Sequence, residues 1–198
     1  MPKSKKSKKS KKSKKLLILN HPLVNKIFAL IFISIGFFVL MGNPYSKPVP
    51  SSKNPIKINE NLYKNQTTQN LPVRILLPNE NIDINVTPSK IINGFWELSE
   101  NTASYGEGSG IPGQNGNTVI FAHAREGLFY NLKDVKINDT IYVFTKDKWY
   151  RYKVTKITAV YPNQTEVIAP TKNQTLTLYT CTGFSDEKRL IVTAIPQN

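Results

Sequence analysis

The chain has 198 residues, with 27 basic and 13 acidic side chains, two histidines and one cysteine. This length accommodates about one domain, and a single cysteine excludes an internal disulfide and any zinc site built from several thiolates. The formal charge of +14 is uneven, because nine lysines and no acidic residue lie in residues 1–15, which leaves +5 for the rest of the chain.

The first 42 residues have the composition of a membrane anchor. Residues 1–15 repeat a Ser-Lys-Lys unit with nothing apolar to bury, which predicts a disordered polybasic tail. Residues 16–42 are the predicted anchor, with an apolar span at about 23–42 that approaches the roughly 20 residues needed to cross a bilayer as a helix. Lysines before such a span favour a cytoplasmic N-terminus and an extracytoplasmic bulk of the chain.

Two other interpretations of this region are weaker. A cleaved signal peptide would need a small-residue site of the Ala-x-Ala type after the span, and none is present. A nucleic-acid-binding arm is not required, because the adjacent span already explains the lysines, and no nucleic-acid partner is expected. Residues 43–70 contain four prolines and many Ser, Asn and Lys residues. This composition predicts an extracytoplasmic linker.

From residue 71 to residue 198 the pattern is that of an all-β domain. Seven runs rich in β-branched and aromatic residues lie at 73–77, 82–86, 118–124, 140–146, 149–161, 175–181 and 189–195. Such runs, with almost no helical period, predict a closed barrel or a sandwich. The run at 149–161 is longer than an ordinary strand and predicts a bend or bulge. Residues 92–117 are rich in Gly, Ser and Asn and suit either a site rim or an ordinary connection.

One set of side chains in this domain could carry chemistry. Cys181 is the single strong nucleophile, His123 is the one histidine of the domain, and Arg189 begins the last run. A thiol nucleophile needs a base or a cation to populate its thiolate, and these residues are the available candidates. Taken singly, each also has a structural interpretation: a buried cysteine, a satisfied histidine and an arginine solvated at a strand edge.

The period of a strand separates the side chains around the cysteine into two faces. One face carries Leu176, Leu178 and Thr180, and the other carries Thr177, Tyr179 and Cys181. Val119, Phe121 and His123 likewise share one face of their run.

Three motifs in this order resemble the sortases, the cysteine transpeptidases that attach surface proteins to the bacterial cell wall or polymerise pili. Thr177-Leu178-Tyr179-Thr180-Cys181 matches the TLxTC pattern of that family. The stretch 117–143 resembles the histidine region, with His123 as the catalytic histidine, and RLIV at 189–192 resembles the strand that carries the catalytic arginine. The resemblance covers residues 71–198.

The resemblance implies a sortase-like closed β-barrel of about eight strands with short helices or loops, after one N-terminal transmembrane helix. It implies that Cys181 attacks an LPxTG-like sorting signal to form a thioacyl-enzyme, with His123 as proton carrier and Arg189 at the oxyanion. Thr180 and Arg125 are weak candidates for substrate binding. The implied partners are proteins with C-terminal LPxTG-like signals and an amine of a cell-wall precursor or a pilin lysine.

The resemblance also limits the subclass and leaves alternatives. The short segment between cysteine and arginine, and the lack of a lid-like segment before the barrel, favour a class A, D or E type. No metal and no cofactor are predicted. A cysteine hydrolase acting on the same signal, or a non-catalytic membrane-tethered β-domain with a buried Cys181, are the alternatives. A papain-like protease is disfavoured because its cysteine precedes its histidine.

Overall fold

The computed structural model describes residues 26, 31–32, 55–63 and 69–197 of the chain, and the fold is given for these residues. The chain divides into two compact units, Met1–Val49 and Pro50–Asn198. Within the described residues, no helix is long and apolar enough to cross a membrane. The span predicted at about 23–42 lies almost wholly outside the described residues.

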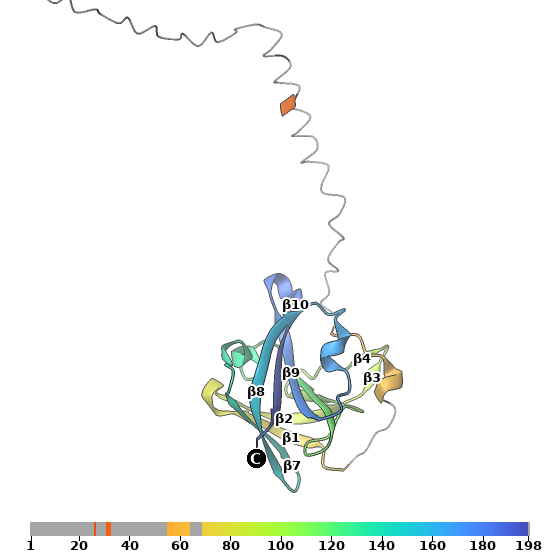
Figure 1. The fold of residues 1–198 in the computed structure, drawn as a ribbon, viewed down its shortest axis with the longest axis vertical. Coiled ribbons are helices and arrows are strands. Elements are labelled where there is room, and N and C mark those ends of the chain that lie inside the picture. Colours follow the sequence, from red (N-terminus) through yellow and green to blue (C-terminus); the bar gives the residue numbers. More distant parts are fainter. Residues whose placement is uncertain (1–25, 27–30, 33–54, 64–68, 198) are drawn as a thin grey trace, which may run out of the picture. The chain divides into compact units, whose positions relative to one another are not determined.

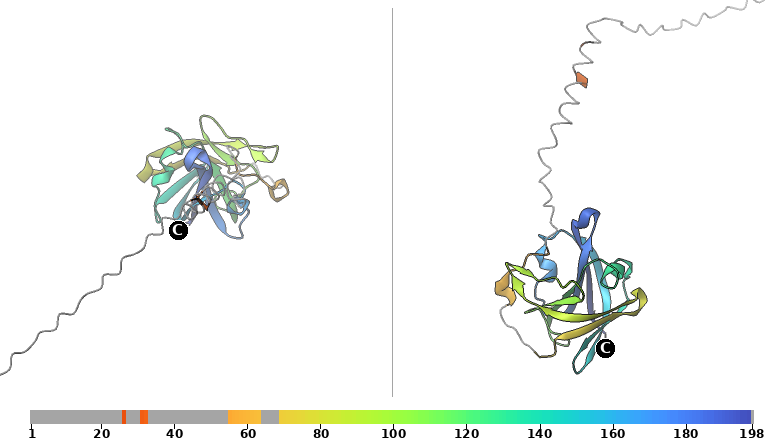
Figure 2. Two further views of the ribbon diagram at one scale, coloured as in Figure 1. Left: turned by 90° about the horizontal axis from the view of Figure 1, so that it is seen from above. Right: turned by 180° about the vertical axis from the view of Figure 1, so that it is seen from behind.

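Eight strands of the second unit form a closed barrel in the order β1-β2-β5-β6-β9-β10-β8-β7 (Figure 1 and Figure 2). The barrel strands are β1 (Pro72–Leu77), β2 (Ile82–Ser89), β5 (Ala103–Gly106), β6 (Gly116–Phe121), β7 (Thr140–Thr145), β8 (Trp149–Val160), β9 (Gln174–Thr182) and β10 (Lys188–Pro196). Neighbouring strands are antiparallel except for the parallel pairs β2–β5 and β6–β9. The predicted all-β closed barrel of about eight strands is confirmed for the described part of the chain.

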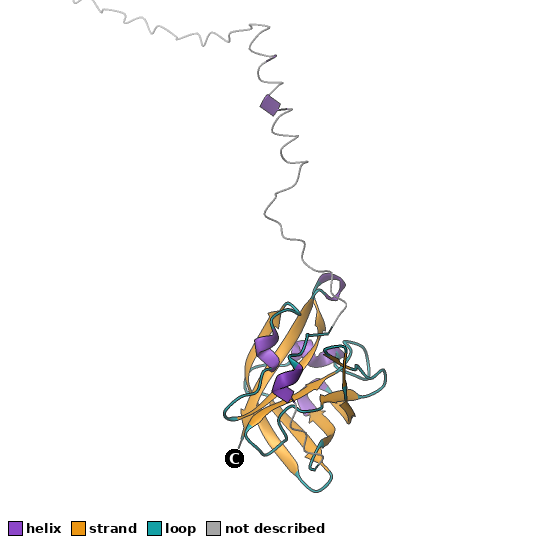
Figure 3. Cartoon of the chain, turned by 90° about the vertical axis from the view of Figure 1, so that its right-hand side faces the viewer, coloured by secondary structure: helices purple, strands orange, loops and turns teal. Residues whose placement is uncertain are grey.

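Short elements connect these strands (Figure 3). A two-stranded sheet contains β3 (Ile91–Ile92) and β4 (Phe95–Trp96). The helical segments of this unit are 3-10 turns: η1 (Glu60–Tyr63), η2 (Pro78–Glu80), η3 (Tyr130–Asp134), η4 (Thr165–Ile168) and η5 (Phe184–Asp186). Within the described residues of this unit, each helical segment is therefore a short 3-10 turn of three to five residues.

All seven predicted runs overlap barrel strands, and the bulge predicted in the longest run is confirmed. β8 has 12 residues, and its pairing with β10 shifts register between Thr193 and Ala194. Thr193 pairs with Lys156 but Ala194 pairs with Val154, so Thr155 is the extra residue on β8. One extra residue bends a strand and increases its twist, which helps a long strand to follow a barrel wall.

Strand β5 lies in the segment 92–117, for which the sequence predicted a site rim or an ordinary connection but no strand. Its residues, Ala-Ser-Tyr-Gly, contain one strong β-former, and the pattern therefore gave no strand signal. All four are nevertheless buried, because β5 lies between β2 and β6 in the barrel. Gly106 is needed there since a Cβ atom at this position would overlap the ring of Trp96.

The sheet formed by β6, β9 and β10 is buried on both faces, which produces two separate cores. Ile120, Leu178 and Val192 belong to the cluster inside the barrel, to which most strands contribute. Phe121 and Tyr179 belong to a second cluster on the other face. The predicted alternation of Leu178 and Tyr179 between two faces is therefore confirmed, as is the shared face of Val119 and Phe121.

Part of the predicted linker packs in the second core. Ile56, Ile58 and Tyr63 are buried there, against Trp96 among others. The Ile58 amide donates to the Gly94 carbonyl at 2.8 Å, and the rings of Tyr63 and Trp96 meet edge to face at 5.0 Å. The packed β-barrel unit therefore begins upstream of residue 71, because the apolar side chains of this segment cover the outer face of the sheet.

Candidate active site

The parallel pair β6–β9 determines where the predicted histidine and cysteine lie relative to each other. Phe121 pairs with Tyr179, and every pair along this ladder has a sequence separation of 58 residues. His123 and Cys181 have the same separation, and each lies two residues further along its strand direction. Their chain segments therefore run side by side past the end of the β6 ladder. The stacked rings of Phe121 and Tyr179, with centroids 4.8 Å apart, form the layer before them.

Two hydrogen bonds extend this contact beyond the last paired residues. The Ala122 amide donates to the Tyr179 carbonyl at 3.3 Å, and the Thr180 hydroxyl donates to the Ala122 carbonyl at 2.7 Å. Thr180 is buried inside the barrel wall. Its hydroxyl therefore ties the residue before His123 to the residue before Cys181, and this bond explains why a threonine suits this position.

Arg189 lies directly opposite Cys181 in the antiparallel pair β9–β10. Its side chain is only 1% exposed, in contrast to the solvated edge residue that is usual for an arginine at the start of a strand. Its Nη1 donates to the carbonyls of Asp186 at 2.8 Å and Lys188 at 2.7 Å. The short loop after the cysteine thus holds the guanidinium, and burial without such partners would be costly.

Burial raises the pKa of the Cys181 thiol, because the thiolate loses hydration there. The positive charge of Arg189 opposes this shift, and the charge of Asp186 adds to it. The net direction is upward, so the resting cysteine is a thiol. A nucleophilic role then requires a group that removes the proton when substrate is bound.

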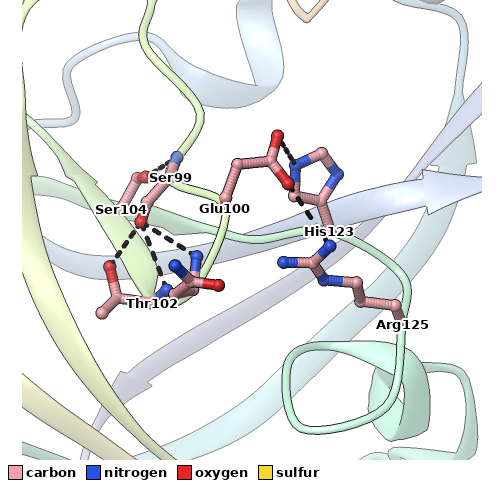
Figure 4. Close-up of polar contacts among 7 residues, drawn as sticks. Ser99, Glu100, Thr102, Ser104, His123 and Arg125 are labelled. Atoms are coloured by element: carbon pink, nitrogen blue, oxygen red, sulfur yellow. Dashed lines mark hydrogen bonds and ion pairs between the residues drawn. The ribbon is translucent and has the colours of Figure 1, made fainter.

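His123 follows the end of β6 in a loop that the barrel interior anchors. The His123 carbonyl accepts the amide of Phe129 at 3.0 Å, and the ring of Phe129 is fully buried in the inner core. The imidazole Nε2 lies 3.4 Å from a carboxylate oxygen of Glu100, whose other oxygen lies 3.3 Å from Nη1 of Arg125 (Figure 4). Arg125, a weak candidate from the sequence, thus reaches the histidine region through Glu100.

The structure brings Cys181, Arg189 and Thr180 together around one small cavity of about 30 Å³. Its other lining residues are Pro55, Leu98, Phe121, Ala122 and Tyr179. His123 and Arg125 do not line it. Larger hollows of about 280 Å³ and 500 Å³ on the described surface contain none of the five predicted site residues.

Three residues near the site were not predicted from the sequence. Pro55 belongs to the predicted linker, and Leu98 and Glu100 belong to the segment 92–117, whose composition suits either a site rim or an ordinary connection. No local pattern marks them, because their place depends on how distant strands pair. Among the described residues, no group of three or more histidine, cysteine or carboxylate side chains is arranged to hold a metal ion.

Comparison with known proteins agrees with this geometry. The family model of the sortase domain matches residues 75–197. The chain belongs to the sortase family. Sortases are cysteine transpeptidases, and their fold is the closed barrel described above.

Individual sortases are similar to this chain over most of the barrel. Sortase A of Streptococcus agalactiae serotype III (strain NEM316) is 33% identical over 144 residues, which is 68% of this chain and 58% of that protein. Sortase A of Bacillus anthracis is 27% identical over 61% of this chain and 57% of that protein. The chain thus spans under three fifths of the length of these two relatives.

Solved sortase structures are similar at the same level. The lid mutant of sortase A from Corynebacterium diphtheriae has a TM-score of 0.56 and 31% identity, covering 64% of this chain and 71% of that chain. Sortase C of Streptococcus pneumoniae has a TM-score of 0.56 and 26% identity, covering 67% of this chain and 72% of that chain. The similarity extends to more than one sortase class.

Proposed function

We propose that this protein is a membrane-anchored cysteine transpeptidase. It cleaves an LPxTG-like sorting signal through a thioacyl-enzyme and transfers the protein to an amine of a cell-wall precursor or a pilin. The observation that carries the proposal is the meeting of Cys181 and Arg189 at one cavity, with His123 two residues beyond the last pair of the neighbouring parallel ladder. Family membership supports the same assignment.

The proposed first half-reaction forms the thioacyl-enzyme. The Cys181 thiol loses its proton to His123, and the sulfur attacks the carbonyl carbon of the Thr-Gly bond in the signal. The carbonyl oxygen gains negative charge, which the buried guanidinium of Arg189 stabilises in a site of low polarity. The C–N bond breaks as His123 returns its proton to the leaving glycine amine.

The second half-reaction releases the product. An acceptor amine loses a proton to His123 and attacks the thioester carbonyl, and the oxyanion again faces Arg189. The C–S bond breaks, and Cys181 recovers its proton from His123. A new amide bond replaces the one that was cut. The thioester keeps the free energy needed to form it, so the reaction needs no other energy source.

The cavity beside Cys181 is small in this structure. Its volume of about 30 Å³ holds roughly one water molecule, and we propose that the sorting signal makes more room as it binds. Pro55 and Leu98 line this cavity together with Cys181, and they come from segments outside the barrel strands. The signal peptide displaces one or both of them when its carbonyl reaches the sulfur.

The proposed location is the cell membrane, in a single pass with the N-terminus in the cytoplasm and the barrel outside. The polybasic residues 1–15 and the apolar span at about 23–42 support this topology. We propose the anchor at 16–42, then a linker from 43 and the catalytic domain to 198. The buried Ile56 and Tyr63 move the start of the folded part into the predicted linker.

The test uses the full-length protein purified in detergent. It is incubated with a pool of LPxTG-like peptides and an excess of glycine-based or lysine-based amine, beside the Cys181→Ala variant, and read by mass spectrometry. Amide products that need Cys181 support transpeptidation and show which acceptor is used. Carboxylate products alone favour the hydrolase. Absence of product and of acyl-enzyme, with Cys181 resistant to alkylation in the folded protein, favours the non-catalytic β-domain.

A further inference from the structure

The carboxylate of Glu100 joins two side chains of the histidine loop. One oxygen lies 3.4 Å from His123 Nε2, and the other lies 3.3 Å from Arg125 Nη1 (Figure 4). Glu100 itself is 70% exposed, while His123 is 31% exposed. The three residues come from two segments that are separate in the sequence. Glu100 precedes β5, and His123 and Arg125 follow β6.

The turn that carries Glu100 is held by its own side chains. Ser104 Oγ accepts the Ser99 amide at 3.0 Å. Ser99 Oγ accepts the Thr102 amide at 3.2 Å and the Thr102 hydroxyl at 2.7 Å. These bonds lie on both sides of Glu100 and hold the backbone of the turn from which its side chain extends.

The nitrogen that Glu100 approaches is shielded from solvent. His123 Nε2 is buried, and it makes no hydrogen bond of good geometry within the described residues. The charged oxygen that the described structure places beside this nitrogen is Oε1 of Glu100, at 3.4 Å. A carboxylate beside one imidazole nitrogen fixes which nitrogen carries the proton and how the ring is oriented.

We propose that Glu100 is a positioning residue for His123, held in place by Arg125. This inference rests on the proposed transpeptidase function. Glu100 keeps a proton on Nε2 and supports the imidazolium when His123 accepts a second proton. The other nitrogen, Nδ1, is then the one that takes the thiol proton of Cys181 and gives it to the leaving amine. Arg125 acts on the reaction through Glu100, rather than by contacting the substrate.

The exposed position of Glu100 makes it easy to test. Exposed ion pairs contribute about 0–1 kcal/mol to stability, so removing one charge leaves the protein folded. The Glu100→Gln variant keeps the shape and loses the charge, and Glu100→Asp keeps the charge on a shorter side chain. Glu97→Gln is a matched control, because it removes the same charge from an exposed residue three positions earlier.

The first measurement is steady-state kinetics of the full-length protein in detergent with an LPxTG-like peptide and an amine acceptor. We expect Glu100→Gln to lower kcat about 10-fold with KM nearly unchanged, Glu100→Asp to recover part of the loss, and Glu97→Gln to match the wild type. Adding Arg125→Gln to Glu100→Gln should cause no further loss, because both changes interrupt one chain of contacts. A rise in KM alone, or an unchanged kcat, overturns the proposal.

The second measurement does not depend on the proposed activity. In 15N-labelled full-length protein, the imidazole Nε2–H proton of His123 is observed by NMR. We expect a signal protected from exchange in the wild type and in Glu97→Gln, and its loss in Glu100→Gln. A missing signal in the wild type, or one that survives in Glu100→Gln, overturns the proposal. If this signal behaves as expected while no peptide is turned over, the proposed function has failed and the contact stands.

Discussion

The hydrogen bond between Thr180 and Ala122 provides a sharp test of how the barrel aligns the segments that carry His123 and Cys181. Thr180→Val keeps the shape of the side chain but removes the hydroxyl that donates to the Ala122 carbonyl at 2.7 Å. Thr177→Val is the matched control on the same strand. Thr177 is equally buried, and its hydroxyl donates across the same strand pair to Asn117 Oδ1 at 2.7 Å.

Both variants should lose a similar amount of stability. Removing one partner of a buried hydrogen bond costs about 1–2 kcal/mol, since the other partner stays in a dry place. Urea unfolding at one pH measures this loss by linear extrapolation, and an unchanged slope with denaturant would show that the two states kept their compactness. Thr180→Ser keeps the hydroxyl and should retain most of the stability.

The two variants should differ in activity. The bond at Thr180 ties the residue before His123 to the residue before Cys181, so its loss permits the imidazole and the sulfur to drift apart. A misplacement of about 1 Å in a reacting group can cost on the order of 100-fold, and we expect kcat of Thr180→Val to fall at least 10-fold. Thr177→Val should stay within about twofold of wild type. Equal kcat values for the two valine variants would refute this reasoning.

Two further predictions concern stability and are read by urea unfolding. Burial, and then the hydrogen bond and charge of Asp139, raise the pKa of Glu80 to about 7 from its ordinary 4.5, so the folded protein holds a proton that the unfolded chain releases. The contribution of Glu80 to the free energy of unfolding is therefore present below about pH 4.5 and lost as pH rises through 7. Between pH 5 and 8, Glu80→Gln should make the loss of stability smaller than in the wild type by roughly 2–3 kcal/mol. Parallel pH profiles of the two proteins would contradict this prediction. Ile56→Ala, which opens a space in the outer core, should cost about 2–4 kcal/mol, whereas a change under 0.5 kcal/mol would mean that the segment before β1 is not part of the folded unit.

Much of the barrel followed from local sequence pattern, because strand alternation has a period of two and needs no knowledge of the partner strand. The run 175–181 predicted two faces, and Leu178 and Tyr179 occupy different cores. The long run at 149–161 predicted a bulge, which lies at Thr155. The order of histidine, cysteine and arginine was likewise visible as residue types in sequence, and their motifs resemble one family.

Local sequence pattern did not predict the position of a segment where that position depends on pairing with strands distant in the sequence. β5 has a weak propensity for strand, and its place comes from β2 and β6 on either side. Ile56 and Tyr63 lie in a polar, proline-containing stretch, yet they are buried because the outer face of the β6–β9–β10 sheet must be covered. Their burial is a property of the sheet rather than of the stretch itself.

The sequence alone indicated the kind of chemistry available, since the β-domain contains one thiol and one histidine, which leave few choices of nucleophile and proton carrier. Only the tertiary structure decided their arrangement. The constant 58-residue offset of the parallel β6–β9 pair carries His123 alongside Cys181. The antiparallel β9–β10 register buries Arg189 opposite the thiol. Glu100 reaches His123 only because the barrel closes through β5, and no local pattern encodes a contact between segments that meet by strand pairing.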